Sequence, residues 1–119
     1  MADIRMGPAE TQFAEIIWAT EPVASGVLSQ KAEEALNWKK TTSFTVLKRL
    51  CERGIFQNQN GIVTSQISRE VFFARHSEQY VQETFGGSLP AFMAAFGTRK
   101  KLTDSEIDEM KKLIESMRG

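Results

Sequence analysis

Residues 38–56, WKKTTSFTVLKRLCERGIF, carry the pattern of an amphipathic helix that ends at a glycine. The inward-facing positions recur at spacings of three and four residues, as on one side of an α-helix, and they are Ser43, Val46, Leu47 and Leu50. Gly54 suits the position after the helix because glycine adopts the left-handed conformation at little cost. The stretch therefore predicts a helix that docks one face on a core.

The opposite face of this predicted helix carries hydroxyl groups and cations. Thr and Ser are poor helix formers, so a face selected only for solubility would carry Glu and Lys instead. Short hydroxyls and cations suit a surface that contacts the phosphates and base edges of DNA. Residues 37–56 hold five basic side chains against a single acidic one, a surplus of four. The predicted DNA-contacting residues are Lys39, Lys40, Thr41, Thr42, Phe44, Thr45, Lys48 and Arg49.

These residues have different expected roles. Lys39 and Lys40 are expected on the phosphate backbone, and Phe44 against a thymine methyl group. Thr42, Thr45, Lys48 and Arg49 are the candidates for contacts in the major groove and with phosphates. Two of these residues have a structural alternative to DNA contact. Arg49 could form a salt bridge with Glu52, three residues later. Phe44 could belong to the core if the helix is slightly rotated.

Two helices and a hairpin surround the central stretch. The first helix opens at Pro8 and ends before Pro22, and the second covers residues 25–36 with Val27 and Leu28 among its buried residues. A helix, a short turn and a hydroxyl-rich helix make the helix-turn-helix pattern. Two β-branched runs then flank an Asn-Gly pair at residues 60–61, which predicts a β-hairpin. The prediction is a mainly α fold with a small β-hairpin wing.

The C-terminal part contains three predicted helices with apolar faces and no sheet for them to cover. They begin near Ser68, Ser88 and Thr103, and the last begins with a capping box of Thr103 and Glu106. Either these helices fold back on the N-terminal part or they pack against a second copy, and we favour the second copy. We therefore expect a winged-helix DNA-binding domain at residues 1–67 and a helical dimerisation domain at residues 68–119. The expected dimerisation residues are Phe72, Phe73, Tyr80, Phe85, Leu89, Phe92, Phe96, Ile107, Met110 and Ile114.

Composition narrows the class of protein. The chain has 119 residues, no net charge, one cysteine (Cys51) and one histidine (His76). A single cysteine forms no internal disulfide, and the N-terminus lacks an apolar signal core, so we expect a cytoplasmic protein. No run of apolar residues is long enough to span a membrane. We predict no metal site, no cofactor and no enzymatic activity, because the sequence lacks the residues to build an active site.

Several segments resemble the BlaI/MecI/CopY family of bacterial winged-helix repressors, which includes the penicillinase repressors. The resemblance covers nearly the whole chain and rests on AEIIW at residues 14–18, on Trp38, Thr42, Thr45, Leu47, Arg49, Leu50 and Gly54, on FGGS at 85–88, on residues 92–96 and on LTDSEI at 102–107.

The resemblance implies a homodimeric repressor that binds a palindromic double-stranded DNA operator through its winged helix. It also implies that a membrane sensor protease, acting indirectly, triggers cleavage in the dimerisation part. The matching bond joins Ala95 and Phe96. An alternative remains open, because winged helices also build protein complexes without binding specific DNA.

Overall fold

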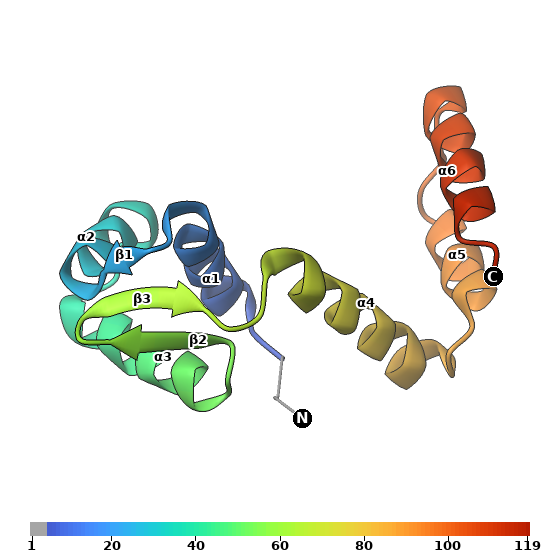
Figure 1. The fold of residues 1–119 in the computed structure, drawn as a ribbon. Helices are drawn as coiled ribbons and strands as arrows, with labels where there is room; N and C mark the ends of the chain where they lie inside the picture. The colour runs from blue at the N-terminus through green and yellow to red at the C-terminus, as the bar shows by residue number, and fades with distance from the viewer. Residues whose placement is uncertain (1–4) are drawn as a thin grey trace. The chain divides into compact units, whose positions relative to one another are not determined.

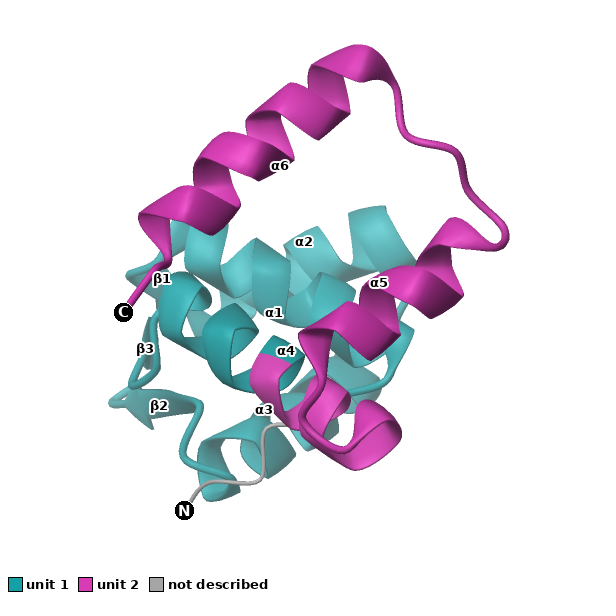
Figure 2. Cartoon of the chain, turned by 90° about the vertical axis from the view of Figure 1, so that its right-hand side faces the viewer, with its two compact units in different colours: residues 1–77 teal, residues 78–119 magenta. Residues whose placement is uncertain are grey.

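The computed structural model describes residues 5–119, which form six helices and three strands (Figure 1). The helices are α1 (Pro8–Thr20), α2 (Ser25–Leu36), α3 (Lys40–Glu52), α4 (Arg69–Phe85), α5 (Leu89–Gly97) and α6 (Asp104–Ser116), and the strands are β1 (Val23–Ala24), β2 (Phe56–Gln59) and β3 (Ile62–Ser65). The chain divides into two compact units, residues 1–77 and residues 78–119 (Figure 2). We call them unit 1 and unit 2. The predicted domain boundary between residues 67 and 68 lies ten residues before the boundary between these two units, which falls inside α4.

Unit 1 contains a three-stranded antiparallel sheet in the order β1-β3-β2. The wing hairpin pairs Phe56 with Ser65 and Gln59 with Ile62. Asn60 and Gly61 make its two-residue turn with φ of 53° and 83°, the left-handed conformations that a type I′ turn requires. The predicted hairpin is confirmed.

The third strand was not predicted. In β1, Val23 pairs with Val63 and Ala24 with Ile62. A two-residue strand leaves no alternation in the sequence, so only the pairing reveals it.

The core of unit 1 lies between the first three helices and the sheet. Its buried apolar residues are Phe13, Ala14, Ile17, Val23, Leu28, Ala32, Val46, Leu47, Leu50, Ile55, Phe56, Val63 and Phe72. The expected inward face of α3 is confirmed, since Ser43, Val46, Leu47 and Leu50 are all buried. The expected burial of Val27 on α2 is wrong, because its side chain is 44% exposed.

The expectation for Phe72 also needs correction. We expected Phe72 on a dimerisation surface, but its side chain is 1% exposed and belongs to the unit 1 core. Its ring packs 5.2 Å from the rings of both Trp18 and Phe73 and 5.7 Å from His76. The first turns of α4 thus complete the winged-helix core.

Unit 2 is helical and has no buried residue. α4 ends before Gly86 and Gly87, whose φ values of 59° and 84° break the helix. Ser88 caps α5, and the predicted capping box between Thr103 and Glu106 is present at the start of α6. No side chain of α5 or α6 is buried. Across residues 5–119, none of the helices combines the length and the apolar character needed to cross a membrane.

Candidate nucleic-acid interface

The outer face of α3 is the candidate interface. Its buried side docks on the unit 1 core, so the opposite side is left to solvent. The predicted contact residues on that side are all exposed: Lys39, Lys40, Thr41, Thr42, Thr45, Lys48 and Arg49. Phe44 is half-buried at the edge of the face and is absent from the core cluster. Seven of the eight predicted residues thus lie in α3, and Lys39 immediately precedes it.

Cations and hydroxyls gather at the N-terminal half of this face. Lys39 is the N-cap of α3 and makes no side-chain capping bond, so the positively polarised helix end adds to the lysine charges. The Lys40 ammonium lies 5.9 Å from the centre of the Phe44 ring. Thr45 donates its hydroxyl hydrogen to the Thr41 carbonyl at 2.8 Å, which leaves its oxygen as an acceptor.

Arg49 lies at the other end of the face and has a partner in α1. Its Nη1 donates to Glu10 Oε1 at 3.3 Å, and the Arg53 Nη1 lies 3.8 Å from Glu10 Oε2. The alternative pairing of Arg49 with Glu52 is therefore corrected, since the acid that it meets is 39 residues earlier. Glu10 escaped the sequence reasoning because a contact over that separation has no local signal.

The other basic residues of this face are three lysines. In the described part of the chain, Lys39, Lys40 and Lys48 take part in no ion pair. Arg49 and Arg53 share the carboxylate of Glu10. The three lysines therefore carry positive charge that no ion pair in the described residues compensates.

The wing contributes amides and hydroxyls. Gln57 donates to the Thr64 hydroxyl at 3.0 Å and accepts from Gln66 at 3.1 Å. Asn58 and Gln59 are exposed near the turn. Amide groups hydrogen-bond phosphate oxygens without adding charge.

Cys51 lies on α3 away from the exposed face. Its side chain is half-buried against the core. Burial raises the pKa of the thiol, and the neighbouring Glu52 carboxylate raises it further. The thiol therefore stays protonated and weakly reactive at neutral pH.

Eight of the ten predicted dimerisation residues lie on unit 2, and their side chains are aromatic or aliphatic. The rings of Tyr80, Phe85, Phe92 and Phe96 contact one another in sequence at 5.6 to 6.2 Å. Phe85, Phe92 and Met110 are half-buried, whereas Tyr80, Leu89, Phe96, Ile107 and Ile114 are exposed. Phe73 lies in unit 1, next to Trp18.

The bond between Ala95 and Phe96 lies in the last turn of α5. The Ala95 carbonyl accepts hydrogen bonds from the backbone N–H of Thr98 at 3.3 Å and from its hydroxyl at 2.7 Å. Both flanking side chains are exposed. A protease would meet this bond in helical conformation.

Metal chemistry has no candidate site within residues 5–119. No group of three or more His, Cys, Asp or Glu side chains there is arranged to hold an ion. His76 instead stacks on Phe72.

Comparison with known proteins identifies the family to which the chain belongs. The family model described as "Penicillinase repressor" matches residues 6–116. The chain is also similar to the penicillinase repressor of Bacillus licheniformis, with 19% identity over 115 residues that cover 93% of this chain and 90% of that protein. The family consists of DNA-binding transcriptional repressors rather than enzymes. The chain therefore belongs to the penicillinase repressor family.

Proposed function

We propose that the protein represses transcription by binding a palindromic operator as a homodimer, with α3 in the major groove. The observation that carries this proposal is the exposed face of α3, where three lysines that form no ion pair within residues 5–119 accompany a row of threonines. A helix in a helix-turn-helix presents such a face to base edges while cations hold the phosphates.

The individual contacts follow from position on the helix. Lys39 and Lys40, at the uncapped N-terminus of α3, hold a backbone phosphate. Thr41, Thr42 and Thr45 meet base edges through their hydroxyls and thymine methyl groups through their own methyls. Phe44 and Lys48 are four residues apart and therefore lie along the same border of this row.

Arg49 has a double role in this proposal. Its contact with Glu10 orients the guanidinium while the side chain stays 45% exposed. A phosphate therefore competes with Glu10 for Arg49. Removal of Arg49 loosens α3 from α1 as well as weakening the DNA contact.

Dimerisation is supported by the exposed apolar surface of unit 2. Residues 78–119 bury none of their large side chains, and a segment this small does not stabilise itself without a partner surface. A second copy offers the same surface, and two-fold pairing suits a palindromic operator. Phe72 and Phe73 are left out of this proposed interface.

Relief of repression by proteolysis is the last part of the proposal. Family membership supports cleavage between Ala95 and Phe96 after a membrane sensor protease responds to an antibiotic or cell-wall signal. The Thr98 hydrogen bonds to Ala95 mean that the last turn of α5 opens before cleavage. Mass spectrometry of the protein from induced cells tests this step, and a fragment ending at Ala95 is the expected product.

The central experiment measures binding to DNA upstream of the protein's own coding region across a salt series. Wild-type protein is compared with Lys40→Ala, Thr42→Ala and the control Lys112→Ala, which removes one cation from α6. We expect Lys40→Ala to reduce the salt slope of log K by about one and Lys112→Ala to leave the slope unchanged. Thr42→Ala should weaken operator binding by roughly tenfold and leave binding to random DNA unchanged.

Two results would contradict the proposal. Binding to the operator no tighter than to random DNA would remove the specific-repressor function. Absence of DNA binding even at low salt would favour a protein-interaction module built on the same fold.

A further inference from the structure

The carboxylate of Glu10, in the first turn of α1, contacts two arginines, one in α3 and one at the C-cap of that helix. Arg49 Nη1 donates to Glu10 Oε1 at 3.3 Å, and Arg53 Nη1 lies 3.8 Å from Glu10 Oε2. Arg53 has a second partner, because its Nη1 also donates to the Arg5 carbonyl at 2.8 Å. An acidic side chain of α1 is therefore in contact with the helix that carries the candidate interface.

Glu10 is a fixed partner for these arginines. Its side chain is 21% exposed, and its Oε2 atom is buried without a hydrogen bond among the described residues. α1 is anchored in the unit 1 core by Phe13, Ala14 and Ile17, which are fully buried. α3 is anchored in the same core by its own buried face. Close packing therefore fixes the backbones that carry Glu10 and Arg49 relative to each other.

Arg49 belongs to the same exposed row as the threonines. Thr42, Thr45 and Arg49 are spaced by three and four residues, which places them along one line of the helix surface. The Arg49 side chain is 45% exposed, and within residues 5–119 its guanidinium makes one hydrogen bond, the one to Glu10. A guanidinium has five N–H donors, so most of them remain for a phosphate of DNA.

Holding the guanidinium at one atom makes its DNA contact depend on the docked pose. In a pose that brings a phosphate to the free N–H groups, Arg49 binds it without leaving Glu10. In any other pose the phosphate has to displace the carboxylate, which costs a charge-assisted hydrogen bond and leaves a negative charge beside the DNA. Phosphate contacts made in many poses supply non-specific affinity, whereas a contact limited to one pose fixes the register of the specific complex.

We propose that Glu10 is a positioning residue that raises the preference of the repressor for its operator over random DNA, by restricting the phosphate contact of Arg49 to the docked pose. Glu10 itself makes no contact with DNA in this arrangement. The inference rests on the proposed function, since it requires specific binding through the exposed face of α3.

The test measures dissociation constants for the operator and for random DNA of the same length at one salt concentration, and compares their ratio between variants. The ratio removes the general effect of deleting a negative charge, which strengthens binding to both DNAs alike. The full-length variants are Glu10→Ala, Glu10→Gln, Arg49→Ala and the double variant Glu10→Ala/Arg49→Ala.

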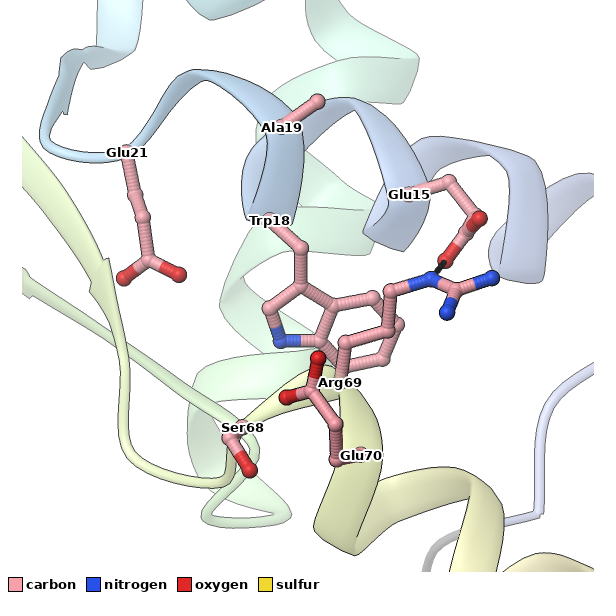
Figure 3. A pocket seen from close by; sticks show the side chains of 7 residues that line it. All are labelled: Glu15, Trp18, Ala19, Glu21, Ser68, Arg69 and Glu70. Atoms are coloured by element: carbon pink, nitrogen blue, oxygen red, sulfur yellow. Dashed lines mark hydrogen bonds and ion pairs between the residues drawn. The ribbon is translucent and has the colours of Figure 1, made fainter.

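Glu15→Ala is the matched control, because it removes a carboxylate from the same helix, and the ion-pair partner of Glu15 lies in α4 rather than in α3. Glu15 lines a cavity of about 250 Å³, where its Oε1 accepts a hydrogen bond from Arg69 Nε at 2.7 Å (Figure 3). We expect Glu15→Ala to keep the wild-type ratio.

We expect Glu10→Ala to lower the operator preference by about fivefold. Loss of one exposed ion pair accounts for roughly a twofold change, and a dimer on a palindrome contains two such pairs. Glu10→Gln should lose only about twofold in total, since its amide oxygen accepts the same hydrogen bond without the charge. In the Arg49→Ala background, Glu10→Ala should leave the ratio unchanged, because the residue through which Glu10 acts is gone.

Two results would overturn the positioning role and leave the repressor function intact. One is a ratio for Glu10→Ala equal to that of wild type. The other is an equal loss of the ratio with and without Arg49, which would show that Glu10 acts by another route. Wild-type protein without preference for the operator over random DNA would instead remove the proposed function, and the inference with it.

Discussion

Unit 1 buries many of its apolar side chains, whereas unit 2 buries none. Every buried apolar residue belongs to residues 1–77, where helices close over a small sheet. In residues 78–119 no apolar side chain is buried, and the exposed fractions of Leu113, Ile114 and Met117 are 60%, 58% and 65%. The difference separates a domain with its own core from a segment whose apolar side chains stay exposed.

The contrast does not come from weaker helix signals in unit 2. α6 has a complete capping box between Thr103 and Glu106, whereas α1, α2 and α3 lack a side-chain cap. Local signals decide that a helix forms and where it starts. A core needs surfaces from several elements, and only unit 1 has a sheet against which its helices pack.

The largest expected effect distinguishes a true core residue from a surface aromatic. Phe72→Ala removes a side chain that is 1% exposed and should lower the free energy of unfolding of unit 1 by about 3–5 kcal/mol. Both tryptophans, Trp18 and Trp38, lie in unit 1, so tryptophan fluorescence during urea unfolding reports on this unit.

Phe96→Ala is the matched control in unit 2. Its ring is 44% exposed, so we expect little change in the fluorescence transition. Equal losses for the two variants would show that the division into a core and an open surface is wrong.

A charge on the apolar face of α6 tests whether that face is covered in solution. Ile114→Glu should raise the dissociation constant of the dimer by roughly a hundredfold, about 3 kcal/mol, because an interface would bury an unpaired carboxylate. Sedimentation velocity over a concentration series measures the change.

Lys112→Glu places the same carboxylate on the polar face of α6 and should leave the dimer intact. A monomeric wild-type protein, or equal effects of the two variants, would contradict the proposed interface.

The smallest expected effect concerns a polar atom inside unit 1. The Ser43 hydroxyl is buried on α3 without a hydrogen-bond partner in the described residues. Ser43→Ala should therefore stabilise unit 1 by about 1 kcal/mol, since it removes an unsatisfied group and improves helix propensity. Urea unfolding again provides the measurement.

Ser65→Ala is expected to act in the opposite direction. The Ser65 hydroxyl donates to the Glu21 carboxylate, so its loss leaves that acceptor with fewer bonds. A destabilising Ser43→Ala would indicate that the hydroxyl has a partner in solution.

Much of the candidate interface could be predicted because its signals are local. The spacing of Val46, Leu47 and Leu50 determines which side of α3 is buried, and the lysines and threonines follow on the other side. The Asn60-Gly61 turn likewise requires only the two residues that adopt left-handed conformations.

The contacts of Arg49 and Arg69 could not be predicted in this way. Each arginine meets a glutamate of α1, at 39 and 54 residues of separation. Phe72 and Val27 were misplaced for the same reason, since apolar character alone does not say which helix or strand will cover a side chain.

Local sequence patterns are sufficient to predict where the helices and the hairpin form and which face of α3 is exposed, and they also carry the resemblance to the winged-helix repressors. These features depend on periodicity, capping and turn residues within a few positions of one another. Three features became visible only in the folded chain: Phe72 completes the unit 1 core, β1 joins the sheet, and Glu10 and Glu15 pair with arginines of α3 and α4. Those features arise when segments distant in the sequence pack together. Which residues then come into contact depends on the shapes and charges of the packed segments.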